Sequence, residues 1–323
     1  MRALILSLEE EVYLRLVVRF AASLPPMIGY AIAVRRADIR RILDKPSRTR
    51  VACDLESLLG EEIGPTERRR IVRDFFRHKS CKTLDTALIC KNPMSYQKLV
   101  EVCGRENINA ALERGKGTIL CTAHLNATNL LAVLTIFGVP AREIARWSYT
   151  ARKPGRHRFV PPRVSRQTDF VRLVPQNIET SGETRNRPLS VAVEAAAYLR
   201  KNKAIVIAID VGVRDPVRSV RLRFLNREAT VLPGSVFIAK LAGAPLLMAL
   251  MHRSPDWRHQ RLEISPPVPV EGSTTEALGR CLDFVDASIR REPAQWDFWG
   301  TRELRAELGL LPENDQEEIL ASG

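Results

Sequence analysis

The sequence has few of the residues from which metal centres and disulfide frameworks are built. Its six cysteines are scattered without a C-x-x-C pair, and no two of its five histidines lie four positions apart. In a chain of 323 residues, this pattern indicates the reduced thiols of a cytosolic protein and excludes a disulfide framework. We therefore expect no bound metal and no bound cofactor.

Aromatic residues are also scarce, at 6% of the chain, although the net charge is +13. Residues 142–172 carry nine basic side chains against two acidic ones, and few aromatic residues lie among them. A binder of single-stranded nucleic acid needs aromatic platforms on which bases stack, so nucleic acid is not an expected partner. The charge instead predicts attraction to an anionic bilayer or an acidic protein, which salt would screen.

Long apolar runs are missing as well. A membrane-spanning helix needs about twenty apolar residues, whereas residues 20–34 are uncharged but interrupted by Pro25 and Pro26. Flanking arginines make this stretch typical of two short helices lying in a bilayer interface. The alternative is a pair of core helices in a soluble domain. Residues 1–8 are too short for a secretion signal.

The remaining patterns predict an α/β fold with a mixed, mostly parallel sheet flanked by helices. We divide the chain into a helical N-terminal region associated with the membrane surface (1–103), an α/β domain (104–302) and an acidic C-terminal tail (303–323). The tail has six acidic residues and one arginine. Strands are expected at 118–122, 144–149, 204–209, 218–224, 246–251 and 262–265, and helices at 67–77, 95–103, 107–114, 190–200, 236–241 and 275–291.

His124 lies at a predicted junction between strand 118–122 and an apolar helix. Asp210 directly follows the apolar strand 204–209. Parallel strands end at the same edge of a sheet, so both side chains are expected at that edge. The unpaired N–H groups of the helix start disfavour imidazolium and predict a neutral His124. Asn126 has the side chain of a helix N-cap.

Four blocks of sequence together resemble the late acyltransferases of lipid A biosynthesis, a branch of the lysophospholipid acyltransferase superfamily. The resemblance covers about residues 10–302. It implies transfer of a fatty acyl group from a carrier thioester, on acyl carrier protein or coenzyme A, to a hydroxyl of a lipid or glycolipid at the cytoplasmic face of the cell membrane. The blocks are Gly115–Gly117 with the strand before His124, the strand before Asp210, Phe224–Thr230 with Pro233 and Gly234, and Glu292 and Pro293 with Gln295, Trp296 and Trp299.

The resemblance implies that His124 is the general base of a His-x4-acid motif, but the acid position is occupied by Asn129. An asparagine can accept a hydrogen bond from imidazole but cannot stabilise imidazolium by charge. Three explanations fit this departure. Asp210 supplies the charge, the acceptor is an amine that needs less base assistance, or the protein is a catalytically impaired homologue that binds acyl lipid or carrier protein without transfer. We assign His124, Asn129 and Asp210 to catalysis.

The resemblance also suggests how substrates bind. Arg146 resembles the arginine after the family's second strand and is assigned to the phosphate or headgroup of the acceptor. Arg221 and Arg223, with the arginines of 152–172, are assigned to an acidic carrier protein or anionic headgroups, and Asn126 to substrate binding. Trp296 and Trp299 are expected in the core, and Cys121 is expected to be a buried thiol and not a nucleophile. The expected partners are the carrier thioester, the acceptor and an anionic membrane surface, to which the protein binds peripherally.

Overall fold

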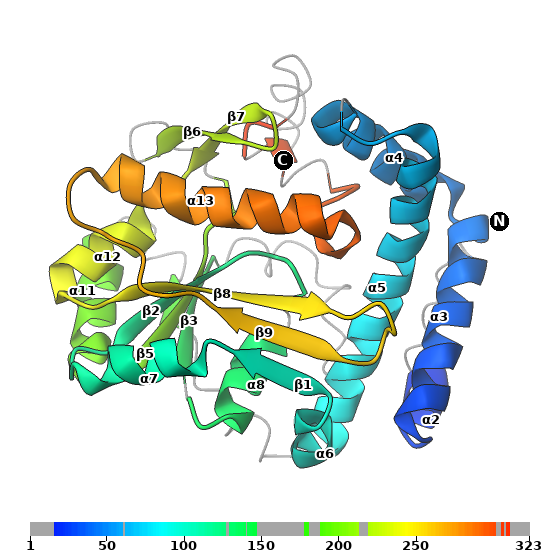
Figure 1. Ribbon diagram of the computed structural model, residues 1–323, viewed down its shortest axis with the longest axis horizontal. Coiled ribbons are helices and arrows are strands. Elements are labelled where there is room, and N and C mark those ends of the chain that lie inside the picture. The colour runs from blue at the N-terminus through cyan, green and yellow to red at the C-terminus, as the bar shows by residue number, and fades with distance from the viewer. Residues whose placement is uncertain are drawn as a thin grey trace.

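The structure is a computed structural model of the chain. Helices pack on both faces of a central sheet, and a bundle of N-terminal helices covers one end of it (Figure 1). The residues that the structure describes are 16–60, 62–126, 129–139, 141–146, 178–180, 188–212, 219–301, 305–306 and 308–310.

Within the described residues, the central sheet has seven strands in the order β1-β9-β8-β2-β5-β3-β4. Every neighbouring pair is parallel except β8 with β9, which is antiparallel. The predicted mixed α/β fold with a mostly parallel sheet is therefore confirmed. The strands are β1 (Val100–Cys103), β2 (Thr118–Thr122), β3 (Ala141–Arg146), β4 (Ile178–Thr180), β5 (Ala204–Ala208), β8 (Leu246–Arg253) and β9 (Gln260–Ile264).

Strands β2 and β8 lie inside the sheet, and every residue of both is buried. Their apolar runs suit this position, because a strand covered on both faces needs no polar alternation. Alternate residues of β2 enter two different hydrophobic cores, with Ile119 and Cys121 on one face and Leu120 on the other. The first core packs against α11 (Pro188–Leu199), α12 (Gly234–Ala242) and α13 (Thr274–Arg291), and the second against α7 (Arg105–Glu113) and α8 (Leu130–Ile136).

The described residues of the N-terminal part form five helices, of which α5 is the longest. Helix α3 packs along α5 (Figure 1), where Arg77 pairs with both carboxylate oxygens of Asp38 at 2.8 Å. None of the helices in the described ranges combines the length and apolar character that bilayer crossing requires. The helices are α2 (Val18–Ala21), α3 (Pro26–Leu43), α4 (Lys45–Leu59), α5 (Pro65–Lys91) and α6 (Pro93–Gln97).

A separate hairpin, β6 (Val220–Phe224) with β7 (Arg227–Val231), packs on α13. Its turn residues Leu225 and Asn226 have φ values of 48° and 64°, as expected for a two-residue turn that matches strand twist. Asn226 tolerates this conformation, and its amide donates to the carbonyl of Leu58 at 3.0 Å and to Glu62 at 2.7 Å. The Phe224–Thr230 block is therefore a structural clamp between the hairpin and α4.

One expectation about local structure is wrong, and two others have the right element type but inaccurate bounds. Residues 95–103 do not form one helix, because α6 ends at Gln97 and Val100–Cys103 forms edge strand β1 beside β9. The expected helix 67–77 is part of the much longer α5. Strand β3 begins at Ala141, earlier than expected, because its first residues pair with β5. In the first case the tertiary pairing decides, since a four-residue segment has no periodicity of its own.

Candidate functional site

His124 lies just beyond the end of β2, in the turn before α8. Thr122 of β2 is in register with Ala208 of β5, so His124 and Asp210 each lie two residues past paired positions. The expectation that they meet at one sheet edge is confirmed. The His124 side chain is 37% exposed, whereas Asp210 is completely buried.

Asp210 holds His124 through both of its carboxylate oxygens. Oδ1 lies 2.8 Å from Nδ1 of the His124 ring, and Oδ2 accepts the His124 backbone N–H at 2.8 Å. Oδ2 also accepts the Nε1–H of Trp296 at 2.9 Å. With Nδ1–H donating to Asp210, Nε2 is the ring nitrogen left to accept a proton. This is the arrangement in which a buried carboxylate orients a histidine base.

The segment after the short 3₁₀ helix Pro293–Gln295 forms the other wall of the site. Its backbone bridges to the residues around His124, because Leu125 pairs with Trp296 and Asp297 donates its N–H to the His124 carbonyl at 2.9 Å. The Phe298 ring lies 4.4 Å from the His124 ring, centre to centre. Trp296 and Trp299 are buried in edge-to-face contact, as predicted for core residues. Sequence reasoning missed Phe298 and Asp297, although they lie between two residues of a recognised block.

The protonated form of His124 is stabilised, which corrects the expectation of a base kept neutral by helix donors. Burial lowers the pKa of His124, but the charge of Asp210 and its hydrogen bond more than offset this and raise the pKa above 6.5. Asp297 adds to the increase and Lys82 opposes it. Helix α8 begins at Leu130, whereas the carboxylate of Asp210 contacts the His124 ring directly.

Two further charged side chains, Lys82 and Glu143, interact electrostatically with His124. Lys82 of α5 donates to the carboxylate of Asp297, and this charge keeps the pKa of Asp297 low although burial raises it. Glu143 of β3 lies within electrostatic range of His124, and burial raises the pKa of its carboxyl while the His124 charge lowers it. Neither residue was singled out from the sequence, because a charged side chain on a helix or strand is most often a solvated one.

Asn129, at the position of the motif acid, has Thr86 as its hydrogen-bonded neighbour. Its Oδ1 accepts the Thr86 hydroxyl at 3.2 Å, while its Nδ2 has no hydrogen-bond partner among the described residues. Asn129 is buried and precedes the first residue of α8, without capping it through its side chain. The side chain that contacts Nδ1 of His124 is therefore Asp210, whereas Asn129 contacts Thr86.

Among the described residues Asn126 caps no helix, because its side-chain oxygen has no hydrogen-bond partner there, which corrects the N-cap interpretation. Its φ is 53°, a conformation that asparagine adopts more readily than most residues, and its side chain is buried. Its Nδ2 donates to Gln260 at 2.7 Å, and Gln260 in turn donates to the hydroxyl of Tyr96. This chain of contacts fixes the backbone two residues after His124.

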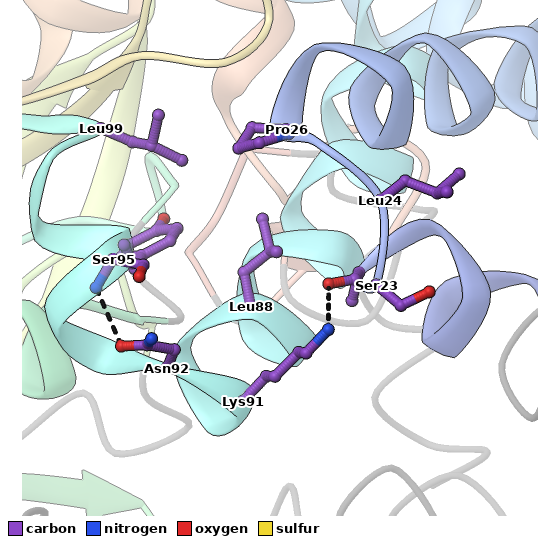
Figure 2. A pocket seen from close by; sticks show the side chains of 10 residues that line it. Ser23, Leu24, Pro26, Leu88, Lys91, Asn92, Ser95 and Leu99 are labelled. Atoms are coloured by element: carbon purple, nitrogen blue, oxygen red, sulfur yellow. Dashed lines mark hydrogen bonds between the residues drawn. The ribbon is translucent and has the colours of Figure 1, made fainter.

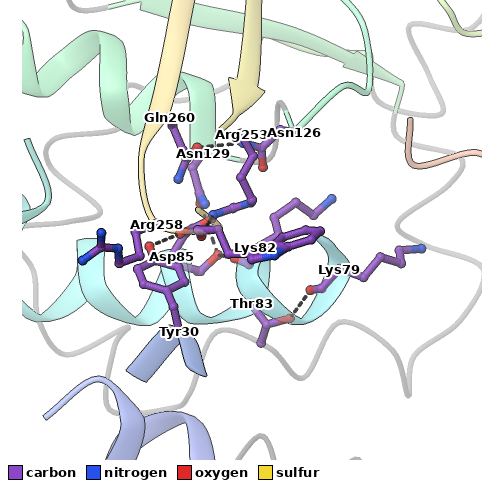
Figure 3. A network of polar contacts seen from close by, with 12 residues as sticks. Tyr30, Lys79, Lys82, Thr83, Asp85, Asn126, Asn129, Arg253, Arg258 and Gln260 are labelled. Atoms are coloured by element: carbon purple, nitrogen blue, oxygen red, sulfur yellow. Dashed lines mark hydrogen bonds and ion pairs between the residues drawn. The ribbon is translucent and has the colours of Figure 1, made fainter. Parts of the chain in front are cut away.

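A buried ion pair lies beside this chain (Figure 3). Arg253 of β8 pairs with Asp85 of α5, and Asp85 also accepts the hydroxyl of Tyr30 from α3. The charge of Asp85 raises the pKa of Arg253 against the effect of burial. The network ties the N-terminal helices to the sheet near the site. Arg253 at the end of the apolar strand β8 was the available signal, because a buried charge requires a partner.

The predicted substrate arginines are only partly within the described residues. Arg146 is the last residue of β3, but its side chain and residues 152–172 lie outside the described part. Arg221 and Arg223 are exposed on β6, with Leu222 half-buried and Phe224 buried, as the alternating pattern predicted. Cys121 is fully buried, and the pKa of its thiol is raised by contact with Cys281 and by burial.

The family model of the bacterial lipid A biosynthesis acyltransferases matches residues 12–305, which span both the N-terminal helices and the sheet. The chain belongs to this family. The suspected resemblance is thereby confirmed, and membership supports acyl transfer in lipid biosynthesis as the activity. A search of curated proteins gives no match to the chain.

Proposed function

We propose that the protein transfers a fatty acyl group from a carrier thioester, acyl carrier protein or coenzyme A, to a hydroxyl or amine of a lipid, glycolipid or related acceptor. His124 is the general base, and Asp210 orients it and balances its charge. The observation that carries this proposal is the 2.8 Å contact between Nδ1 of a partly exposed His124 and Oδ1 of the buried Asp210. It supports the first explanation for the missing motif acid, since a carboxylate contacts the ring from another strand.

The reaction follows from this geometry. Nε2 of His124 takes the proton of the acceptor while the oxygen or nitrogen of the acceptor attacks the thioester carbonyl. Asp210 stabilises the imidazolium that forms, and the tetrahedral oxyanion then collapses and expels the thiolate, which receives the proton from Nε2. The products are the acylated acceptor and the free carrier thiol. Nearby donors stabilise the oxyanion in this scheme, and no covalent enzyme intermediate is required.

The charge of the chain supports an acidic partner. Arg221 and Arg223 are exposed on a hairpin whose strand β7 bridges from Val231 to Gly212, two residues after Asp210. We assign this hairpin to docking of an acidic carrier protein or of anionic headgroups. Charge steering of this kind raises association rates more than affinity and weakens with salt.

The N-terminal helices support peripheral attachment to the cytoplasmic face of an anionic membrane. Several large apolar side chains of α3 and the residues before it point into solvent, and arginines at 19 and 35 are exposed among them. Such a surface buries its apolar side chains in the interface while its cations meet lipid phosphates. The exposed apolar side chains are Leu16, Phe20, Met27, Ile28, Ile39, Ile42 and Leu43.

His124→Ala tests the chemistry. With acyl thioester and extracted lipids as substrates, mass spectrometry should detect an acylated product with the native protein and none with the variant. A native protein that sequesters acyl thioester without any turnover would refute transfer and favour the impaired homologue that only binds.

Vesicle flotation tests the attachment. The protein should float with anionic vesicles at low salt and dissociate as salt is raised, because surface charge attraction is screened within about 10 Å at 0.1 M salt. Absence of binding to anionic vesicles at low salt would contradict the peripheral location.

A further inference from the structure

A pocket of about 200 Å³ lies between the turn that joins α2 to α3 and the C-terminal end of α5 with α6. Figure 2 shows Leu88 and Lys91 of α5 reaching toward Ser23 of that turn and Pro26, the first residue of α3. Leu24, Leu99 and Tyr96 complete the apolar part of the lining, and Asn92 and Ser95 lie at its edge. Neither His124 nor Asp210 lines it, so it is distinct from the proposed catalytic site.

The described lining of the pocket carries one positive charge. Lys91 is the charged member of its described lining, and no described carboxylate lies beside it there. Its Nζ donates to the carbonyl of Ala22 at 3.1 Å, which holds the ammonium against the turn (Figure 2). An ammonium has three donors, so the ammonium can also bind an anion that enters the pocket.

Exposed apolar residues adjoin the lining residues along the chain. Met27 follows the lining residue Pro26, and Met94 lies between the lining residues Asn92 and Ser95; both methionines are 64% exposed. Phe20, which precedes the turn, is 61% exposed. Flexible thioether side chains suit contact with irregular apolar ligands such as alkyl chains. A cation near exposed apolar side chains matches a ligand that carries an anion next to hydrocarbon.

We propose that this pocket binds the headgroup of an anionic glycerophospholipid. Its phosphate contacts Lys91, its glycerol lies among Leu88, Leu99 and Pro26, and its acyl chains leave along Met27 and Met94. The volume is below the 300–1,000 Å³ of typical sites for drug-sized ligands, so it suits a headgroup and not an entire lipid. The inference rests on the proposed membrane attachment only for how the lipid arrives.

Soluble short-chain lipids test the site without a bilayer. Dihexanoyl phosphatidylglycerol, kept below its micelle concentration, is titrated calorimetrically into the full chain, in parallel with dihexanoyl phosphatidylcholine and inorganic phosphate. Phosphatidylglycerol should bind about tenfold more tightly than either of the other two, because only it combines net charge with alkyl chains.

Two variants and a control locate the binding. Lys91→Met removes the charge but keeps the apolar stem and should weaken binding of phosphatidylglycerol about tenfold, as expected for a charged hydrogen bond. Ser95→Trp fills the pocket from its exposed edge and should weaken binding at least as much. Lys116→Met, an exposed lysine before β2, loses the same charge and should leave the affinity within about twofold. Unchanged melting temperatures establish that the variants fold.

Equal affinity for phosphatidylcholine would overturn the assignment to an anionic lipid, and equal affinity for inorganic phosphate would show a site for free anions. Equal weakening by Lys116→Met would indicate general charge attraction and overturn the site. The proposal is separable from catalysis, because His124→Ala should lose acyl transfer but bind phosphatidylglycerol like the native protein. If His124→Ala matches the native protein in both acyl transfer and phosphatidylglycerol binding, the proposed base is wrong while the lipid site stands.

Discussion

The substitution Asp210→Asn tests the proposed catalytic pair most directly, because it removes a charge without changing the side-chain shape. Two donors, the backbone N–H of His124 and the Nε1–H of Trp296, point at Oδ2. The asparagine must offer its carbonyl oxygen to these donors, which turns its NH₂ toward Nδ1 of His124. Nδ1 then becomes an acceptor, and the ring proton moves to Nε2. In this tautomer Nε2 cannot take a proton from the acceptor.

The expected loss in turnover is about 10⁴-fold, the size measured for the corresponding substitution in a serine protease of unrelated fold. This equals roughly 5.4 kcal/mol of activation free energy. The fold should survive, since the hydrogen bonds at the former Oδ2 position are kept. The native enzyme should gain activity as pH rises through the raised pKa of His124, above 6.5. Removing the Asp210 charge should move that pKa downward.

The assay is a steady-state measurement of product formation across pH 5–9, with ¹⁵N NMR of the histidine rings to assign the tautomer. Asn129→Ala is the matched comparison, because Asn129 contacts Thr86 and lies outside the contacts of the His124 ring. We expect its loss to stay within about tenfold. The reasoning is refuted if Asp210→Asn keeps a tenth of native turnover, or if Asn129→Ala is the variant that loses 10⁴-fold.

Three further variants test contacts in other parts of the structure. Trp296→Phe keeps an apolar ring but deletes the donor to Asp210, and it should lower kcat about tenfold, since hydrogen bonds to charged groups contribute about 1.5–3 kcal/mol; unchanged kcat in a folded variant would contradict this role. His78 is fully buried without a partner for either ring nitrogen among the described residues, and burial and the Arg253 charge hold its pKa well below 6.5. The unfolded chain therefore binds the proton more readily, so stability to urea should fall below pH 6.5 by up to ~1.4 kcal/mol per pH unit, a slope that His78→Leu should reduce. Asn226→Gly keeps the turn but deletes contacts to Leu58 and Glu62, and it should lower the free energy of unfolding by about 1–3 kcal/mol; an unchanged urea midpoint would show that the clamp does not contribute.

The sequence predicted those parts of the molecule whose cause is local. The apolar runs of β2 and β5, the amphipathic pattern of α13 and the alternation of Arg221 to Phe224 each depend on side chains close in the chain. The rule that parallel strands end at one edge then sufficed to place His124 near Asp210. Local reasoning failed at Val100–Cys103, where pairing with β9 some 160 positions later along the chain determines the structure.

The sequence by itself determined the family, the α/β fold and the position of the histidine, because motif order and periodicity are properties of the chain. Only the tertiary structure decided which side chain holds the ring. Asp210 and Asn129 both carried an oxygen that could serve, and the choice depends on β5 lying directly beside β2 while Asn129 turns to Thr86 on α5. It also decided the protonation balance of His124, since the charges that surround it come from α5, β3 and the segment after Gln295. Electrostatic interactions act through space, and those elements meet only when the chain is folded.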